Sequence, residues 1–202
     1  MKLPEGIYGI TSRDFGLTHI ESARVLLRAG IKIIQYREKE ASTRRMLEEA
    51  REIKKLCMDH GAIFIVNDRM DIALAVEADG IHIGQDDMPL EIVKRFFHGI
   101  VGVSASNLRE AMEAQKGGAD YLGVGSIYPT GTKKDSEIIG IDVLREIARN
   151  VNIPIYAIGG INLDNLANIK KLKIHGVAVI SAILASKDPE NMARRFLEEW
   201  KK

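Results

Sequence analysis

The chain has 202 residues, of which 46% are hydrophobic, and a formal net charge of +1. This charge balance gives no reason to expect binding to nucleic acid or to a membrane surface, so small molecules are the expected partners. No linker or low-complexity tract divides the chain, and residues 1–202 are therefore expected to form one domain. Neither a signal-peptide pattern nor an apolar window of about 20 residues is found, which predicts a cytoplasmic location.

Short apolar runs alternate with amphipathic patterns along the whole chain. Strands are predicted at 7–11, 31–35, 62–66, 80–83, 100–104, 120–125, 154–158 and 176–180. Helices are predicted at 18–29, 43–60, 71–77, 90–97 and 163–172. Three more are predicted by one end only: one begins at 107, one ends at 150 and one begins at 188. Helix caps are expected at Thr18, at Asn107 and at Asp188, which precedes a proline. A polar loop at 126–136 follows the sixth strand.

Eight βα units with continuously apolar strands predict an α/β fold, a closed (β/α)8 TIM barrel. A doubly wound open sheet is the alternative, but it normally begins with a glycine-rich turn, and residues 11–16 do not form one. Because 202 residues is near the lower limit of about 200 for this barrel, a compact barrel with short βα loops is expected. Catalytic groups of such barrels lie at the carboxyl ends of the strands.

Two carboxylates follow neighbouring strands of the predicted barrel. Asp68 follows the third strand and Asp87 follows the fourth. Since consecutive strands of a β-α-β unit lie parallel and adjacent, both side chains should emerge at the same edge of the sheet. Oxygen ligands without Cys or His neighbours favour Mg²⁺ over zinc. Each aspartate could instead cap the helix that follows it.

Cationic and polar residues follow the second strand at alternate positions. Gln35, Arg37 and Lys39 would point to one side of an extended segment, where the two cations suit a phosphate or diphosphate. A solvated charged turn is the alternative interpretation. The pattern thus predicts an anion site beside the two carboxylates.

Small and hydroxyl-bearing residues follow the later strands. The loop after the sixth strand contains Thr130, Thr132 and Lys133, which suit anion binding but are also ordinary turn residues. The turns at 159–161 and 180–182 occupy the place where barrels often bind phosphate on backbone N–H groups. A second anion site is therefore predicted there.

The histidines and the cysteine give little sign of chemistry. None of the five histidines has a Cys or His partner at metal-ligand spacing, so structural or solvent-exposed positions are expected. His82 lies in a predicted strand, where its side chain could point inward. The single cysteine, Cys57, excludes a disulfide scaffold and is expected to be buried and inert.

The strand-end motifs resemble those of the thiamine-phosphate synthase family, also called thiamine-phosphate pyrophosphorylases. The matching segments, in chain order, are QYREK at 35–39, ND at 67–68, GIHIGQ at 80–85 with Asp87, GVS at 102–104, PTGTK at 129–133, GGI at 159–161 and ISA at 180–182. They cover nearly the whole chain. Two positions depart from the usual family pattern, Ser12 where an acid is frequent and Ser126 where proline is common.

The resemblance implies a transferase reaction that uses Mg²⁺. Hydroxymethylpyrimidine diphosphate and a carboxylated thiazole phosphate are joined to give thiamine phosphate, with release of diphosphate and CO₂. Loss of the diphosphate is dissociative in the mechanism that the resemblance implies, and no protein nucleophile is needed.

The resemblance also implies roles for individual residues. The residues that would hold the pyrimidine diphosphate are Gln35, Arg37, Lys39, Asn67, Ser104 and Lys133. Those that would hold the thiazole phosphate are Thr130, Thr132, Gly160, Ile180 and Ser181. Asp68 and Asp87 would bind Mg²⁺, and the residues implied to be catalytic are Lys133, Ser104 and Arg37.

Two other functions are weighed against this interpretation. A thiazole tautomerase would share the barrel but would need no diphosphate site. The residues that argue against it are Arg37, Lys39, Asp68, Asp87 and Lys133. A non-catalytic regulator that senses a thiamine precursor would be expected to carry a DNA-binding segment or basic face, and neither is visible. The sequence leaves a monomer and a homo-oligomer equally open.

Overall fold

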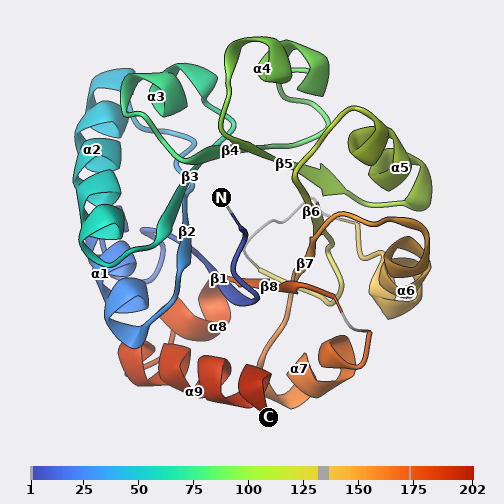
Figure 1. The fold of residues 1–202 in the computed structure, drawn as a ribbon. Helices are drawn as coiled ribbons and strands as arrows, with labels where there is room; N and C mark the ends of the chain where they lie inside the picture. Colours follow the sequence, from blue (N-terminus) through green and yellow to red (C-terminus); the bar gives the residue numbers. More distant parts are fainter. Residues whose placement is uncertain (1, 132–136, 173) are drawn as a thin grey trace.

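The computed structural model describes residues 2–131, 137–172 and 174–202, and within them eight parallel strands close into a barrel (Figure 1). The strands are β1 (Gly6–Ile10), β2 (Ile33–Tyr36), β3 (Ile63–Asn67), β4 (Gly80–Ile83), β5 (Ile100–Ala105), β6 (Tyr121–Val124), β7 (Ile155–Ile158) and β8 (Gly176–Val179). Each strand pairs in parallel with its neighbours in sequence, and β8 pairs with β1. The predicted (β/α)8 barrel is confirmed.

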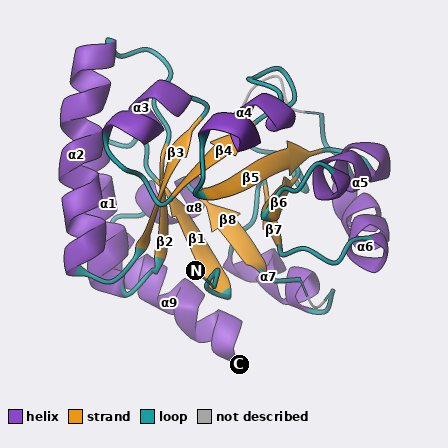
Figure 2. Cartoon of the chain, turned by 45° about the horizontal axis from the view of Figure 1, so that its top comes forward, coloured by secondary structure: helices purple, strands orange, loops and turns teal. Residues whose placement is uncertain are grey.

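Helices surround the barrel on its outer side (Figures 1 and 2). They are α1 (His19–Ala29), α2 (Thr43–Asp59), α3 (Met70–Ala75), α4 (Leu90–Phe96), α5 (Leu108–Lys116), α6 (Gly140–Asn150), α7 (Leu163–Lys170), α8 (Ser181–Leu184) and α9 (Pro189–Lys201). The short helix α8 was not predicted, because a single turn leaves no periodic signal in the sequence. The connection from β6 to α6 runs over 125–139, since α6 begins after the predicted loop.

The predicted helix caps are confirmed. Thr18 forms a full capping box at the start of α1, and the Asp188 side chain accepts from the N–H of Asn191 at the start of α9. The Asn107 side chain accepts from the N–H of Glu110, as expected. The carboxylate of Glu110, however, accepts from the N–H of Ser106 instead of that of Asn107. These caps satisfy N–H groups that the first turn of a helix leaves without partners.

The strands bury apolar side chains on both faces, which explains their uninterrupted apolar runs. Side chains that point outward, such as Phe64 and Val66, pack with the helices in one large cluster. Side chains that point inward, including Ile33, Ile65 and Tyr156, form a second cluster inside the barrel. Alternate residues of one strand therefore belong to different cores.

Residues near the N-terminus close one end of the barrel. Leu3 belongs to the interior cluster, and the Tyr156 hydroxyl donates to the carbonyl oxygen of Pro4 at 2.6 Å. Figure 1 shows the N-terminus inside the ring of strands. The interior therefore opens at the opposite end, where the strands have their carboxyl ends.

Two further expectations concern membranes and the cysteine. Within the described ranges, no helix is long and apolar enough to cross a membrane. The cytoplasmic location remains a prediction. Cys57 is buried, and this burial raises the pKa of its thiol to about 12, which fits the expected inert thiol.

The outer core gives a testable prediction. Phe64 is fully buried on β3, so Phe64→Ala should lower the free energy of unfolding by about 3–5 kcal/mol through the cavity that it leaves. Urea unfolding measures this change. Phe96→Ala is the matched control, because Phe96 is 53% exposed, and it should change stability by less than about 0.5 kcal/mol. Equal losses in the two variants would contradict the assignment of Phe64 to the core.

Candidate active site

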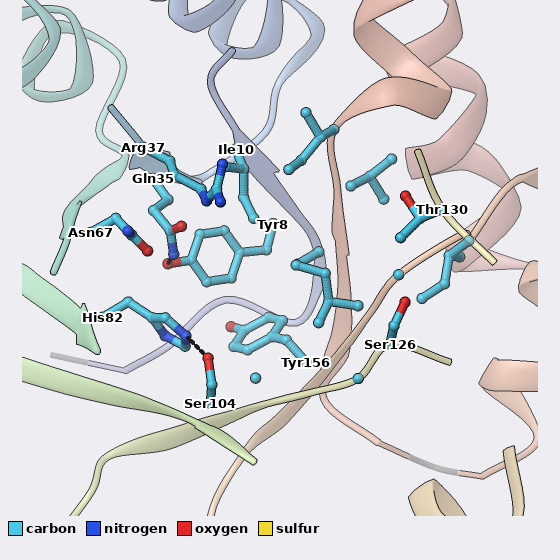
Figure 3. Close-up of a pocket in the computed structure, with 18 of the residues that line it drawn as sticks. Tyr8, Ile10, Gln35, Arg37, Asn67, His82, Ser104, Ser126, Thr130 and Tyr156 are labelled. Atoms are coloured by element: carbon cyan, nitrogen blue, oxygen red, sulfur yellow. Dashed lines mark hydrogen bonds between the residues drawn. The ribbon is translucent and has the colours of Figure 1, made fainter. Parts of the chain in front are cut away.

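A solvent-open pocket with a cavity volume of about 210 Å³ lies at the carboxyl ends of the strands. In Figure 3, Gln35, Arg37 and Asn67 lie on one side of this pocket, and Ser126 and Thr130 lie on the other. The site residues expected from the sequence that line it are Gln35, Arg37, Lys39, Asn67, Asp68, Asp87, Ser104, Thr130, Gly160, Ile180 and Ser181. Thr132 and Lys133 lie outside the described residues. Closure of the barrel thus brings together segments that are far apart in sequence.

Asp68 and Asp87 meet in this pocket. Their carboxyl groups are close enough to affect each other's ionisation, and Lys39 Nζ lies 2.9 Å from Asp68 Oδ2. Asp87 Oδ2 also accepts from the N–H of Gly84 at 2.7 Å. Neither aspartate caps a helix, because the N-cap residues of α3 and α4 are Arg69 and Pro89. The alternative interpretation as helix caps is therefore wrong.

The environment of the two aspartates opposes a double negative charge. Burial raises the pKa of Asp68, and the neighbouring Asp87 carboxyl raises it further, against the effect of Lys39. Burial also acts to raise the pKa of Asp87, but its contact with Asp68 and the hydrogen bond from the Gly84 N–H hold it below its usual value. A bound cation would favour the charged form of both carboxyl groups.

The backbone of Asp68 is fixed in an uncommon conformation. Its φ of 58° lies in the left-handed region, which aspartate adopts more readily than most side chains but at some cost. The N–H of Asp68 donates to the carbonyl oxygen of His82 at 2.8 Å, which ties this turn to β4. The turn thereby directs the Asp68 carboxylate toward Asp87.

The segment after β2 divides its side chains between the pocket and the protein interior. Arg37 and Lys39 line the pocket, whereas Glu38 between them is buried. The Glu38 carboxylate pairs with Arg13 and His19 and accepts from the backbone N–H of Glu40. This anchored carboxylate keeps the alternation in place. Glu38 is therefore not part of a solvated turn, whereas Lys39 and Glu40 beside it are exposed.

Two polar groups at this side of the pocket have unused hydrogen-bonding capacity. In the part of the chain that the structure describes, the Arg37 guanidinium forms no ion pair. The Asn67 side chain forms no hydrogen bond with another described residue, although Asn67 is only 6% exposed. Guanidinium and amide groups carry several N–H donors. They are thus available to a ligand with acceptor oxygens or nitrogens.

The other side of the pocket is built from close backbone contacts. Gly159 and Gly160 have φ values of 100° and 63°, a region that favours glycine. The N–H of Tyr128 donates to the carbonyl oxygen of Gly159 at 3.0 Å, and a Cβ atom at Gly160 would lie 2.4 Å from the carbonyl oxygen of Pro129. These contacts hold the loop with Thr130 against the turn after β7. The first turn of α8, at Ser181, borders the same region.

His82 points inward, as its place in a predicted strand allowed. It is buried, points into the barrel and hydrogen-bonds to Tyr121 Oη and to Ser104 Oγ, each at 3.0 Å (Figure 3 shows the second bond). Tyr8 and Tyr121, which also line the pocket, were missed altogether. The sequence feature that could have identified these residues is a polar or hydroxyl-bearing side chain within an otherwise apolar strand. Such a group needs a hydrogen-bond partner when it is buried.

A family model, curated relatives and a solved structure match this chain, and these matches agree with one another. The family model described as thiamine monophosphate synthase matches residues 7–183. A thiamine-phosphate synthase of Caldivirga maquilingensis is 52% identical, with 99% of this chain and 98% of the relative covered, and one of Archaeoglobus fulgidus is 51% identical, with 95% and 91% covered. A solved thiamine phosphate pyrophosphorylase of Pyrococcus furiosus is similar with a TM-score of 0.92 and 42% identity, covering 97% of this chain and 95% of the other.

The buried histidine predicts a pH dependence of stability. Burial lowers the pKa of His82 from 6.5 to about 4, and the charge of Asp87 opposes this only in part. Between these values the unfolded chain binds a proton that the folded chain does not, so the folded state loses stability as the pH falls. His82→Gln removes the titrating group and with it this loss of stability. Between about pH 7 and pH 4, the free energy of unfolding of the wild type should therefore fall by about 3 kcal/mol relative to that of the variant.

Urea unfolding at a series of pH values measures this difference. His98→Gln, at an exposed position, controls for the loss of one histidine elsewhere in the chain. A constant difference in unfolding free energy between the wild type and His82→Gln over this range would contradict the prediction.

Proposed function

The chain belongs to the thiamine monophosphate synthase family of transferases, and on that basis we propose that it joins hydroxymethylpyrimidine diphosphate to a carboxylated thiazole phosphate. The products are thiamine phosphate, diphosphate and CO₂. The observation that carries the proposal is the pocket, in which a carboxylate pair and Arg37, which has no ion-pair partner among the described residues, face a second, backbone-rich region. The side with the carboxylate pair and Arg37 suits a diphosphate, and the backbone-rich side suits a phosphate.

The leaving diphosphate needs stabilisation of its negative charge. Arg37 and Lys39 supply cations, and Ser104 supplies a hydroxyl at the same side of the pocket; Lys133 is assigned to the same task from the sequence. As the bond between the methylene carbon and the diphosphate oxygen breaks, charge moves onto that oxygen, where fixed donors lower the barrier. The aminopyrimidine ring stabilises the resulting cation, and the thiazole nitrogen captures it.

The donor set at Asp68 and Asp87 fits Mg²⁺. Both groups offer only oxygen ligands, and the proximity of two carboxyl groups in a partly buried site favours a bound cation. His82 is not available as a nitrogen ligand, because both of its ring nitrogens are hydrogen-bonded. When bound, Mg²⁺ neutralises charge on the departing diphosphate.

The thiazole phosphate is assigned to the opposite side of the pocket. Gly160, Ile180 and Ser181 are supported by their position around the turn after β7 and the first turn of α8. Thr130 joins them through the contact between its loop and Gly160. Thr132 belongs to this assignment from the sequence alone. Holding both substrates in one pocket supplies the proximity that a two-substrate reaction needs.

We also propose that residues 1–202 act as a single domain. All helices of the described ranges pack around one closed sheet, and this supports the proposal. The similar proteins are thiamine-phosphate synthases, which supports a synthase and gives no support to a tautomerase or a regulator.

A direct assay tests the proposed function. Purified protein incubated with both substrates and Mg²⁺ should release thiamine phosphate and diphosphate in equal amounts. Isomerisation of the thiazole phosphate alone would instead identify a tautomerase. Binding of a substrate without turnover would identify a regulator, and either result contradicts the proposal.

The carboxylate pair gives a second prediction. Asp68→Asn removes one anionic ligand and should lower kcat about a hundredfold or more, because stabilisation of the leaving group is weakened. Calorimetric titration with Mg²⁺ should show weaker binding as well. Asp86→Asn, at the exposed neighbour of Asp87, is the matched control and should behave like the wild type. Unchanged Mg²⁺-dependent turnover in Asp68→Asn would argue against the metal site.

A further inference from the structure

A chain of hydrogen-bonded side chains crosses the interior of the barrel at the base of the pocket. Gln35 Nε2 lies 2.9 Å from Tyr8 Oη, and Tyr8 Oη lies 2.8 Å from Tyr121 Oη. Tyr121 Oη lies 3.0 Å from His82 Nδ1, and His82 Nε2 lies 3.0 Å from Ser104 Oγ. These residues come from β2, β1, β6, β4 and β5. Both ends of the chain belong to the region assigned to the pyrimidine diphosphate.

The amide at one end sets the direction of every bond in this chain. An amide nitrogen only donates, so Tyr8 Oη accepts from Gln35, and its own hydrogen is available for Tyr121 Oη. With that hydrogen on the bond, Tyr121 accepts from Tyr8 and donates to His82 Nδ1. In the reverse order Tyr8 would accept from both neighbours, and its own hydrogen would have no partner within this chain.

The direction continues through the histidine to the serine. A neutral imidazole that accepts at Nδ1 carries its hydrogen on Nε2, so His82 donates to Ser104 Oγ. Both ring nitrogens of the buried His82 have hydroxyl partners, and a neutral ring suits this apolar, uncharged surrounding better than an imidazolium. Among the described residues, Ser104 Oγ has no other hydrogen-bond partner. Its own hydrogen is therefore available to a ligand in the pocket.

Packing leaves this chain little freedom to rearrange. Tyr8 and Tyr121 are buried, and their rings meet edge to face with centroids 5.9 Å apart. A Cβ atom at Gly102 would lie 2.0 Å from Tyr121 Cζ, and one at Gly123 would lie 2.9 Å from His82 Cε1. Glycines therefore make room for the two rings, and the surrounding strands hold those rings in place.

We propose that Tyr8, Tyr121 and His82 are positioning residues that transmit the direction set by the Gln35 amide, so that the Ser104 hydroxyl is presented as a donor to an anionic oxygen of the diphosphate. This inference rests on the proposed function of the pocket. In the opposite direction Ser104 would donate to His82, and its lone pairs would face the anion, which is repulsive. The buried chain thus fixes a donor at the point where negative charge develops.

The first test reads the tautomer of His82 without any substrate. Nitrogen-15 NMR of histidine-labelled protein near pH 7 should show hydrogen on Nε2 and none on Nδ1 of His82. The His82→Gln variant identifies the resonances by their loss. Hydrogen on Nδ1 would mean that the chain runs in the opposite direction and would overturn the proposal.

The second test is a double-mutant cycle. Tyr121→Phe removes the donor to His82 and should lower kcat about tenfold or more, the value of one hydrogen bond to a charged group. In a Ser104→Ala background the same change should cost less than about twofold, because Tyr121 acts through Ser104. Fully additive losses would overturn the proposal.

Controls separate this inference from simpler explanations. Tyr36→Phe also removes one buried hydroxyl, which donates to Glu49 outside the barrel, and it should leave kcat unchanged. A loss of kcat in Tyr36→Phe equal to that in Tyr121→Phe would overturn the inference. If Tyr121→Phe does not fold, Tyr8→Phe breaks the chain one bond earlier and takes its place in the cycle. A wild type without synthase activity would contradict the proposed function, and the His82 tautomer would still decide the direction of the chain.

Discussion

Closure of the sheet between β1 and β8 is the constraint on which the rest of the structure depends. The pairing of residues 6–9 with residues 176–179 turns a row of parallel strands into a ring. Parallel strands have all their carboxyl ends on one side, so closure converts a line of strand ends into a single rim. Gln35, Asn67 and Ser104 are distant in sequence, yet they line one pocket for this reason.

Several groups of the site adopt arrangements that are unfavourable for them individually. Two aspartate carboxyl groups lie close together where a cation would stabilise them, and Asp68 adopts a backbone conformation that few side chains tolerate. Arg37 lines the pocket without a counter-ion among the described residues. Such arrangements lower stability and persist where the surrounding scaffold holds them. The two packed cores of the barrel provide that scaffold.

The sequence predicts those features that depend on order along the chain. The barrel follows from repeated βα units, and Arg37 and Lys39 reach the pocket because alternate residues of an extended segment share a side. The chain from Gln35 to Ser104 could not be predicted in the same way. Its members come from five strands, and their contacts depend on the register between strands, which an apolar run does not specify. The roles of Thr132 and Lys133 stay predictions, because both residues lie outside the described ranges.

The closed N-terminal end of the barrel determines how ligands enter and leave the pocket. Leu3 fills the interior there, and the hydroxyl of Tyr156 is bound to the backbone of Pro4, so ligands cannot pass through the bottom. The interior of the barrel is open at one end. Whatever reacts inside must arrive and depart on the same side, and anything lodged at the rim obstructs entry and exit alike.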